Sequence, residues 1–372
     1  MNNSIHIKRV EKLRKRLKKT SHDTAWIIQP ENRRYLSGFK AMDPQFTESA
    51  GSLIIGERSC IFMADPRYAL EAQREVSGFQ LKVMKHGIVK DLCGLARQMG
   101  AKKLGFEGNY LTWGLHNELA LELGKFSPPI QFVPLSGIVD DMREIKDDYE
   151  IAALRASARL ICSILNEVIK GLEPGMSERD VASEVEHLAR EGGAEGLAFS
   201  PIVASGPNSA LPHATPTDRR LQRNEPIILD VGVRLNGYCS DITRTVFLGG
   251  PDPYFKKIYT TVRRAQLAAI KEVTPGIRSS QPDKTARQII KDAGFDRYFT
   301  HALGHGVGLA THERPRLGPN KPTNLQKGMV VTVEPGVYIP EKGGIRLEEM
   351  ILLDDHGPVI LTKDTGFYDF ED

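Results

Sequence analysis

The sequence predicts a mixed α/β protein composed of two domains. Its 372 residues suffice for a large hydrophobic core and for two domains. Over roughly the first 140 residues, short apolar runs alternate with helical patterns, which is typical of a small α/β domain. The remainder contains amphipathic helices and strands that gather around a predicted hairpin and near the C-terminus.

The first domain begins with a basic amphipathic helix over residues 5–19, whose charged side chains we expect to lie in solvent. Apolar runs then predict strands at residues 25–29, 52–55, 60–63, 79–84 and 103–107. Helices are predicted at residues 66–76, 89–99 and 112–123. No glycine-rich phosphate loop accompanies these elements, so the pattern does not indicate a nucleotide-binding domain.

A charged segment over residues 140–150 marks the predicted domain boundary. We place the first domain at residues 1–146 and the second at residues 147–372. The second domain begins with a helix whose apolar side chains recur every three or four residues, and a capping box at Ser177 begins the next helix. Later helices are predicted at residues 254–273 and 282–293, and strands at 202–205, 301–309, 329–334 and 345–353.

A hairpin in the second domain carries two acids on one face. Asn236-Gly237 lies between two β-rich runs and favours a two-residue turn with positive φ angles. That turn pairs Asp230 with Thr243 and Asp241 with Gly232, so the two acids become diagonal neighbours about 7–8 Å apart. The acids would repel each other unless a cation lies between them, whereas on a solvent-exposed face they would have no special meaning.

Histidines and acids recur within the apolar or glycine-rich runs of the second domain. The candidates are His213, His301, His305, His312, Glu334, Glu348 and Glu349. Any one of them has a simple structural explanation, such as a hydrogen-bonded core histidine or a solvated strand end. Their recurrence in separate strands instead indicates one shared site. Four carboxylates with one imidazole suit two hard or borderline divalent ions, whose bound water becomes a nucleophile for hydrolysis.

Composition excludes several other classes of protein. The net charge of +3, with both signs well mixed, gives no basic surface for nucleic acid or an anionic membrane. No apolar run approaches the roughly 20 residues that a membrane span requires. The four cysteines lie far apart without zinc-site spacing, which is typical of reduced thiols, so we expect a cytoplasmic protein.

Five motifs in order resemble the creatinase/aminopeptidase P/prolidase family of pita-bread metallopeptidases. They are LDVG at residues 229–232, SDITRT at 240–245, HALGHGVGLATHE at 301–313, VEPGVY at 333–338 and GIRLEE at 344–349. In the first domain, PENRRYLSGF at residues 30–39 is similar to the family's N-terminal domain. The resemblance implies an α/β (α+β) fold with a creatinase-type N-terminal α/β domain and a C-terminal pita-bread catalytic domain. It also implies a homodimer.

The resemblance further implies two divalent metal ions per subunit, each held by side chains of the second domain. Asp230 would be a terminal ligand of one ion, and Asp241 and Glu348 would bridge the two ions. His305 and Glu334 would complete the coordination of the other ion. Carboxylate-rich ligation favours manganese, with cobalt or zinc as alternatives.

The choice of Glu348 over its neighbour Glu349 has a second basis. In one continuous strand, Glu348 shares a face with Arg346, whereas Glu349 lies on the opposite face with Leu347 and Ile351. The family pattern of Arg-x-Glu agrees with this choice.

The same resemblance assigns catalytic roles around the metals. Glu334 would also carry a proton from the attacking water to the leaving amine. His213 and His312 would steady the scissile carbonyl and the developing anion, and Arg346 would offset the crowded negative charge. His301 matches a further active-site histidine, and a purely structural hydrogen-bonding role fits it equally well.

The implied activity is hydrolysis of the Xaa-Pro bond in proline-containing peptides or dipeptides, by an aminopeptidase or a dipeptidase. One alternative is a creatinase-type hydrolase of a non-peptide C–N bond, although such members lack the full ligand set that is present here. A methionine aminopeptidase is disfavoured by the N-terminal domain. The third alternative is a non-catalytic pita-bread binding module.

Overall fold

The computed structural model describes residues 3–43, 45, 47–363, 367–368 and 370. The chain divides into two compact units, Met1–Arg143 and Glu144–Asp372. Lys146 lies in the second unit, where its backbone N–H donates to the Gly328 carbonyl oxygen at 2.9 Å. The predicted division between residues 146 and 147 remains a prediction.

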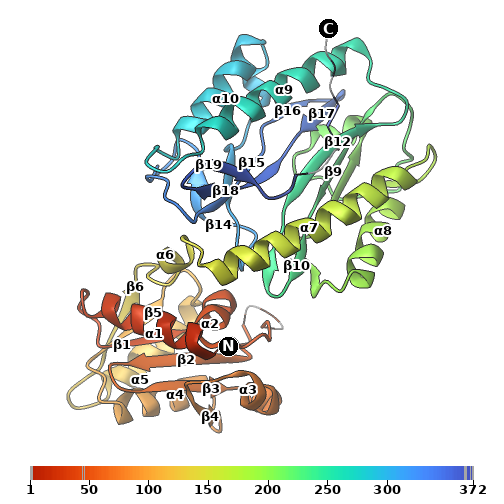
Figure 1. Cartoon of the computed structure of the whole chain (residues 1–372). Coiled ribbons are helices and arrows are strands. Elements are labelled where there is room, and N and C mark those ends of the chain that lie inside the picture. The colour runs from red at the N-terminus through yellow and green to blue at the C-terminus, as the bar shows by residue number, and fades with distance from the viewer. Residues whose placement is uncertain (1–2, 44, 46, 364–366, 369, 371–372) are drawn as a thin grey trace. The chain divides into compact units, whose positions relative to one another are not determined.

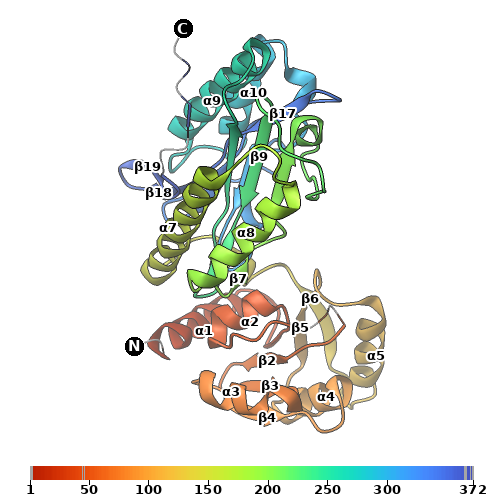
Figure 2. The same ribbon diagram turned by 90° about the vertical axis from the view of Figure 1, so that its right-hand side faces the viewer.

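The first unit contains a mixed six-stranded sheet in the order β4-β3-β2-β1-β5-β6. Its strands are β1 (Thr24–Ile27), β2 (Gly51–Gly56), β3 (Cys60–Ala64), β4 (Gln80–Val83), β5 (Lys103–Glu107) and β6 (Gln131–Leu135). Its helices are α1 (Asn3–Leu17), α2 (Pro30–Ser37), α3 (Ala69–Glu75), α4 (Ile88–Gln98), α5 (Trp113–Gly124) and α6 (Asp140–Arg143). The sheet buries Trp26, Ile54 and Leu104 against apolar side chains of α4 and α5. Figure 2 shows α1 and α2 on one face of this sheet and α3 and α4 on the other.

The motif at residues 30–39 contains α2, a helix that was not predicted from the sequence. Pro30 occupies the first turn, where its missing N–H costs nothing. Arg33 is fully buried and donates to the Asp43 carboxylate at 2.8 Å and to the Gly51 carbonyl oxygen at 2.7 Å. Asn32 donates to the Glu107 carboxylate at 2.6 Å. Polar contacts to distant segments therefore hold this helix in place together with the buried side chains of Tyr35 and Leu36.

The second unit contains four long helices and four small sheets among its described residues. The helices are α7 (Asp148–Gly171), α8 (Glu178–Glu191), α9 (Pro253–Glu272) and α10 (Gln281–Asp292). The first seven strands are β7 (Gly196–Leu197), β8 (Ile202–Ser205), β9 (Pro226–Val231), β10 (Val233–Leu235), β11 (Tyr238–Cys239), β12 (Ile242–Phe247) and β13 (Gly304–Gly306). The last six are β14 (Glu313–Leu317), β15 (Val330–Val333), β16 (Gly336–Ile339), β17 (Gly343–Arg346), β18 (Glu349–Asp354) and β19 (Gly357–Ile360).

The paired strands of the second unit run antiparallel, in the orders β11-β10-β7, β12-β9-β8, β14-β13-β15-β18-β19 and β16-β17. Apolar side chains of α7 and α8 pack against β8, β9 and β12, and those of α9 and α10 pack against β15 to β18. Figure 1 shows α7 and α8 beside β9, and α9 with α10 beside β16. The apolar side chains of these strands are therefore covered by helices.

The predicted hairpin register is confirmed. Asp230 pairs with Thr243, and the turn residues Asn236 and Gly237 have φ angles of 52° and 86°. The hairpin is not one continuous ladder, however, because it divides near Gly232 into β9–β12 and β10–β11. The face of the hairpin that carries Thr245 is covered by β17, since Thr245 Oγ1 donates to the Arg346 carbonyl oxygen at 2.8 Å.

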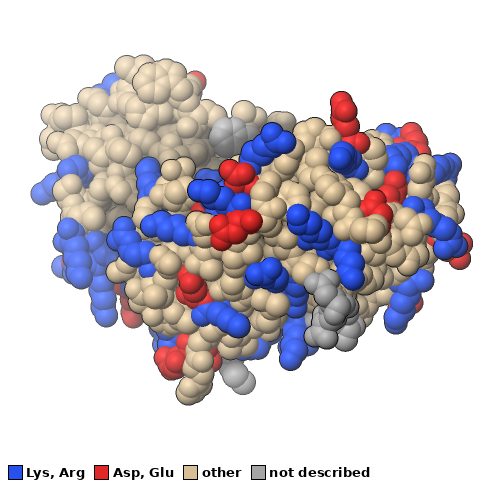
Figure 3. Space-filling view, turned by 90° about the horizontal axis from the view of Figure 1, so that it is seen from above, with Lys and Arg blue, Asp and Glu red and all other residues tan. Residues whose placement is uncertain are grey.

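The surface agrees with the nearly balanced composition of 50 basic and 47 acidic side chains. On the face drawn in Figure 3, Lys and Arg are interspersed with Asp and Glu. Within the described part of the chain, none of the helices combines the length and the apolar character needed to cross a membrane.

Candidate metal centre

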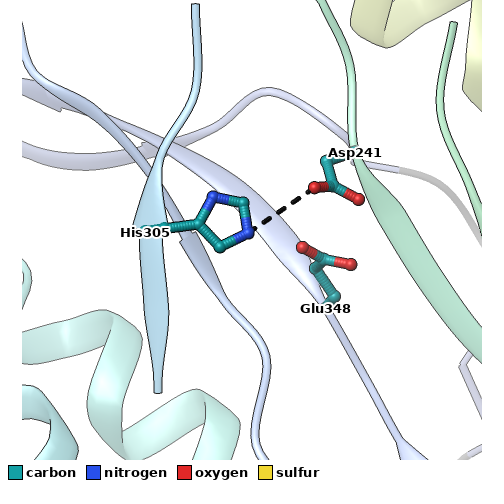
Figure 4. Close-up of side chains that lie close together, drawn as sticks. All are labelled: Asp241, His305 and Glu348. Carbon is teal, nitrogen blue, oxygen red and sulfur yellow. Dashed lines mark ion pairs between the residues drawn. The ribbon is translucent and has the colours of Figure 1, made fainter. Parts of the chain in front are cut away.

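The proposed ligands come from separate segments of the second unit and lie close together. Asp230 lies on β9, Asp241 directly before β12, and His305 in the middle of β13. Glu334 directly follows β15, and Glu348 lies between β17 and β18. The donor atoms of Asp241, His305 and Glu348 all lie within 4.8 Å of one another (Figure 4). Strand ends therefore bring four carboxylates and one imidazole to one place.

The glycines beside His305 allow β13 to pack closely against its neighbours. A Cβ atom at Gly304 would lie 2.0 Å from the Thr332 carbonyl oxygen, and one at Gly306 would lie 2.1 Å from the Arg314 carbonyl oxygen. His305 Nδ1 lies 3.1 Å from the Gly306 carbonyl oxygen, to which it donates. In the neutral ring, this hydrogen bond leaves the lone pair of Nε2 facing the acids, as a metal-binding histidine requires.

His305 joins two of the acids directly. Its Nε2 lies 3.3 Å from Glu334 Oε1 and 3.7 Å from Asp241 Oδ2. Thr332 Oγ1 donates to Glu334 Oε1 at 3.1 Å and accepts from the backbone N–H of His305 at 3.1 Å. The Thr332 hydroxyl thus fixes the separation of these two side chains.

Arg346 connects the cluster to its surroundings. Its Nη2 lies 2.5 Å from Asp230 Oδ2, and its Nη1 donates to the Tyr338 hydroxyl at 2.9 Å and to the Pro212 carbonyl oxygen at 3.1 Å. Its Nε donates to Thr243 Oγ1 at 3.2 Å. The guanidinium therefore offsets the charge of Asp230 in particular, while tying it to three other segments.

Burial and the mutual repulsion of the acids raise the pKa of two carboxylates in the cluster, whereas His305 lowers the pKa of a third. Burial, together with the neighbouring charge of Glu348, raises the pKa of Asp241 well above its usual value. Burial, followed by the charge of Glu334, raises the pKa of Glu348 in the same direction. Burial would also raise the pKa of Glu334, but its hydrogen bond with His305 lowers it to about 2. Although burial alone would lower the pKa of His305, Glu334 raises it overall.

Two carboxylate oxygens of the cluster indicate that it is suited to bind metal ions. Asp230 Oδ1 and Glu348 Oε1 are buried and have no hydrogen-bond partner among the described residues. Buried carboxylate oxygens are costly to leave without a donor or a cation. The oxygen-rich donor set with one imidazole therefore fits hard or borderline divalent cations.

The adjacent glutamates point to different partners. Glu348 faces Asp241 and His305 and accepts a hydrogen bond from Thr243 Oγ1 at 2.8 Å. Glu349 instead forms a buried ion pair with Arg244, with Nη2 at 3.1 Å from Oε1. The predicted single strand over residues 345–353 is interrupted before Glu349, so β17 and β18 replace it.

The three remaining histidines surround the cluster at different depths. The ring centroid of His312 lies 4.2 Å from that of His305, and His312 is exposed. Burial lowers the pKa of His312, and the charges of His305 and His213 add to this effect, which places His213 nearby. His301 Nε2 lies 2.9 Å from the Tyr338 hydroxyl, which accepts from Arg346, so hydrogen bonds connect His301 to the cluster through Tyr338. The charge of His301 also helps to lower the pKa of Glu334.

Sequence reasoning missed the hydroxyl groups that hold the cluster. Tyr338, Thr243 and Thr332 each contact a candidate ligand or Arg346. Tyr338 and Thr243 lie within the recognised motifs, and Thr332 lies two residues before Glu334 on the same strand face. The two-residue spacing was therefore a signal for Thr332. The role of Tyr338 depends on a contact that spacing alone does not reveal.

Known proteins resemble this chain over almost its entire length. Residues 152–355 match metallopeptidase family M24, and residues 9–145 match the creatinase/prolidase N-terminal domain. An Xaa-Pro dipeptidase of Pyrococcus furiosus is 35% identical over 95% of this chain and 97% of its own length. The structure of an Xaa-Pro dipeptidase from Bacillus anthracis has a TM-score of 0.89 at 33% identity, covering 97% and 98% of the two chains. That of an X-Pro aminopeptidase from Thermotoga maritima has a TM-score of 0.84 at 31% identity, covering 96% and 98%.

The fold, the cluster of acids and the sequence matches together identify the protein as a metallopeptidase. The chain belongs to metallopeptidase family M24, with a creatinase/prolidase N-terminal domain. The predicted family, the pita-bread catalytic domain and the hydrolytic class are thereby confirmed. The family also implies a divalent metal, for which Asp241, His305 and Glu348 form a compact candidate site.

Proposed function

We propose that this metallopeptidase hydrolyses the peptide bond between an N-terminal residue and a following proline. The observation that carries this proposal is the cluster of four carboxylates and His305, in which two buried carboxylate oxygens have no hydrogen-bond partner among the described residues. The specificity for proline is supported by relatives named Xaa-Pro dipeptidase and X-Pro aminopeptidase.

In this proposal the centre would hold two divalent ions per subunit. The side chains that would hold them are Asp230, Asp241, His305, Glu334 and Glu348, with Asp241 and Glu348 as the ligands that the two ions would share. The carboxylate-rich donor set favours manganese over cobalt or zinc. Bound metals of this kind polarise a carbonyl group and lower the pKa of a bound water.

The residues around the metals handle protons and developing charge. Glu334 accepts a proton from the attacking water and returns it to the leaving amine, with its Oε1 held by Thr332 Oγ1 at 3.1 Å. His213 and His312 donate hydrogen bonds to the scissile carbonyl oxygen as it becomes an anion. The exposure of both side chains supports contact with substrate.

Two further residues, Arg346 and His301, position the side chains around them and do not contact the substrate in this proposal. Arg346 fixes the orientation of Asp230 through the 2.5 Å contact between Nη2 and Oδ2. His301 has a structural role in this proposal, because its ring nitrogens contact the Tyr338 hydroxyl and the Ala302 carbonyl oxygen. The homodimer expected from the resemblance stays a prediction.

Metal removal combined with two substrates tests the proposal. Dialysis against a chelator should abolish cleavage of an Xaa-Pro dipeptide, and added manganese should restore it. Assay of an Xaa-Pro-Yaa tripeptide in parallel separates a dipeptidase from an aminopeptidase. Undiminished activity in the metal-free protein, or cleavage of neither substrate by the manganese-loaded protein, would contradict the proposal.

A further inference from the structure

Another buried acid of the catalytic domain, Glu178, lies outside the metal centre. It is the first residue of α8, and its side chain is completely buried. Helix capping does not explain the burial of its carboxylate, because Ser177 supplies the cap by accepting from the Asp180 N–H at 3.0 Å. The contacts of the Glu178 carboxylate lie instead in the segment that carries His213.

The Glu178 carboxylate accepts hydrogen bonds from both ends of that segment. At its start, the Ser205 N–H and hydroxyl donate to Oε1, each at 2.8 Å. At its end, the Thr217 N–H and hydroxyl donate to Oε2 at 3.0 Å and 2.6 Å. Asn208 Nδ2 lies 3.2 Å and 3.1 Å from the two oxygens. One carboxylate thus closes residues 205–217 into a loop.

The middle and the tip of this loop are attached to the metal-centre side of the domain. Ser209 Oγ accepts from the Gly344 N–H of β17 at 2.8 Å. The Pro212 carbonyl oxygen, directly before His213, accepts from Arg346 Nη1 at 3.1 Å. Because Arg346 also contacts Asp230, the loop tip and a proposed metal ligand share one guanidinium. The position of His213 therefore depends on the Glu178 end and the Arg346 end together.

The buried charge of Glu178 has a nearby counter-charge. Arg219 Nη1 donates to Ser205 Oγ at 2.7 Å, and Ser205 Oγ in turn donates to Glu178. Arg219 also forms a two-point ion pair with Glu225, with both N–O distances at 2.6 Å. The hydrogen bond with Glu225 raises the pKa of Arg219, and the charge of Glu178 adds to that effect. The Glu178 carboxylate therefore has five donor groups around it and the Arg219 guanidinium one hydroxyl away.

We propose that Glu178 is a positioning residue, which holds the loop of residues 205–217 so that His213 meets the scissile carbonyl oxygen. This inference rests on the proposed function for the role of His213. A carboxylate suits the task because it is acceptor-only and both of its oxygens face donors. A glutamine of the same shape would direct its own N–H donors at those of the loop, which must then shift or lose partners.

The test is a double-mutant cycle in the full-length, manganese-loaded enzyme with an Xaa-Pro dipeptide. Glu178→Gln should lower kcat about 10- to 100-fold, as a displaced catalytic group does, with a smaller change in KM. His213→Ala should lower kcat by a similar or larger factor. In the His213→Ala background, Glu178→Gln should cause little further loss, because its effect passes through His213. If the two losses multiply, or Glu178→Gln keeps the wild-type kcat, the proposal is overturned.

Ser177→Ala is the matched control variant. It removes the cap of the same helix and costs about 1 kcal/mol of stability without touching the Glu178 carboxylate. It should leave kcat unchanged, whereas a loss equal to that of Glu178→Gln would mean that only the stability of α8 matters. Thr217→Val keeps the Glu178 carboxylate and serves if Glu178→Gln does not fold. It removes the 2.6 Å hydrogen bond to Glu178, together with the 3.2 Å hydrogen bonds that Thr217 Oγ1 accepts from Asn208 Nδ2 and the Arg219 N–H. It should show a smaller kcat loss that also vanishes in the His213→Ala background, and a loss that persists there contradicts the proposal.

Hydrogen exchange separates this inference from the proposed function. In Glu178→Gln, backbone amides of residues 206–216 should exchange faster than in the wild type, while those of β9 and β15 should not change. Unchanged exchange in residues 206–216 would overturn the positioning role whatever the substrate is. If the wild type cleaves no Xaa-Pro peptide but the loop amides exchange faster in the variant, the proposed function fails and the structural role of Glu178 stands.

Discussion

Glu348 of the metal centre and Glu178 are both buried in the catalytic domain, but their oxygens are satisfied in different ways. Five donor groups from Ser205, Asn208 and Thr217 surround the Glu178 carboxylate. In the metal centre, Glu348 accepts from Thr243 Oγ1 through one oxygen, while its Oε1 has no partner among the described residues. Burial of a carboxylate is costly in both places, yet only the surroundings of Glu178 supply hydrogen bonds to both of its oxygens.

The difference indicates how to distinguish a structural acid from a metal ligand. A carboxylate with enough N–H and O–H donors organises the chain around it, whereas a group of acids short of donors needs a cation. Glu107 in the first unit is an intermediate case. It accepts from the backbone N–H groups of Ile28 and Gln29 at 2.6 Å and 2.7 Å and from Asn32 Nδ2 at 2.6 Å. Burial nevertheless raises the pKa of Glu107 to about 7.

The largest effects are expected from substitutions at the adjacent glutamates Glu348 and Glu349. Glu348→Gln should weaken metal binding and activity by more than the ~100-fold that outer-shell changes cause, because a proposed bridging ligand is lost. Glu349→Gln should keep the metal but lower the free energy of unfolding by on the order of 3 kcal/mol, because buried Arg244 loses its charged partner. Metal content by elemental analysis and chemical denaturation of both variants provide the two readouts.

The opposite results for the two variants would contradict the assignment of Glu348 as a metal ligand and of Glu349 as the partner of Arg244. A Glu348→Gln protein with its full metal content would remove Glu348 from the ligand set. The metal-free Glu348→Gln protein should be at least as stable as the metal-free wild type, because one of the mutually repelling acids is neutral. A Glu349→Gln protein that lost metal at unchanged stability would contradict the assignment of Glu349 to Arg244.

A smaller effect is expected at His312, which contacts the ring of His305 but is not a proposed ligand. His312→Ala should lower kcat roughly 100-fold, as loss of one donor to a developing anion does, while metal content stays at the wild-type level. Steady-state kinetics together with elemental analysis measure both quantities. Metal loss in this variant would make His312 a ligand and move it into the same group as His305.

The smallest effect concerns the intermediate acid, Glu107, and depends on pH. Its folded-state pKa of about 7 lies above the ordinary value of 4.5, so the folded protein binds the proton more tightly. The resulting stabilisation is complete below the ordinary pKa and is lost as the pH rises through the folded-state pKa. The free energy of unfolding of the first unit should therefore fall by roughly 1.4 kcal/mol per pH unit between about pH 5 and pH 7.

Glu107→Gln should remove this slope, because glutamine does not titrate. Both tryptophans of the chain, Trp26 and Trp113, lie in the first unit, so their fluorescence during urea unfolding reports on that unit. The measurement compares the two proteins at a series of pH values. An equal slope in wild type and variant would show that the donors from Ile28, Gln29 and Asn32 keep Glu107 ionised.

Features that depend on near neighbours in sequence were predicted well. The pairing of Asp230 with Thr243 follows from the Asn236-Gly237 turn, and the capping box at Ser177 begins α8 as expected. Elements whose stability comes from distant partners were missed. Helix α2 is short and depends on buried polar contacts of Arg33 as well as on the buried Leu36. Strand β6 (Gln131–Leu135) contains Pro134, which argues against a strand except at a sheet edge.

The candidate site shows the same division. Motif order was sufficient to nominate Asp230, Asp241, His305, Glu334 and Glu348, and their roles as ligands stay predictions. No sequence pattern singles out Glu178, because its donors Ser205 and Thr217 lie 27 and 39 residues away along the chain. Reasoning from one continuous strand selected Glu348 over Glu349, although the strand is in fact interrupted between Arg346 and Glu349.

The sequence by itself determined the residue types, the local turns and caps, and a motif order specific enough to name the family. These properties depend on backbone preferences and on spacing within a few residues, which a chain carries without being folded. Only the tertiary structure decided which buried acids find donors and which are left facing one another. Hydrogen bonding and desolvation depend on groups that are brought together from distant segments. A glutamate therefore holds a loop in place at Glu178, whereas at Glu348 a glutamate has too few donors and is suited to bind a cation.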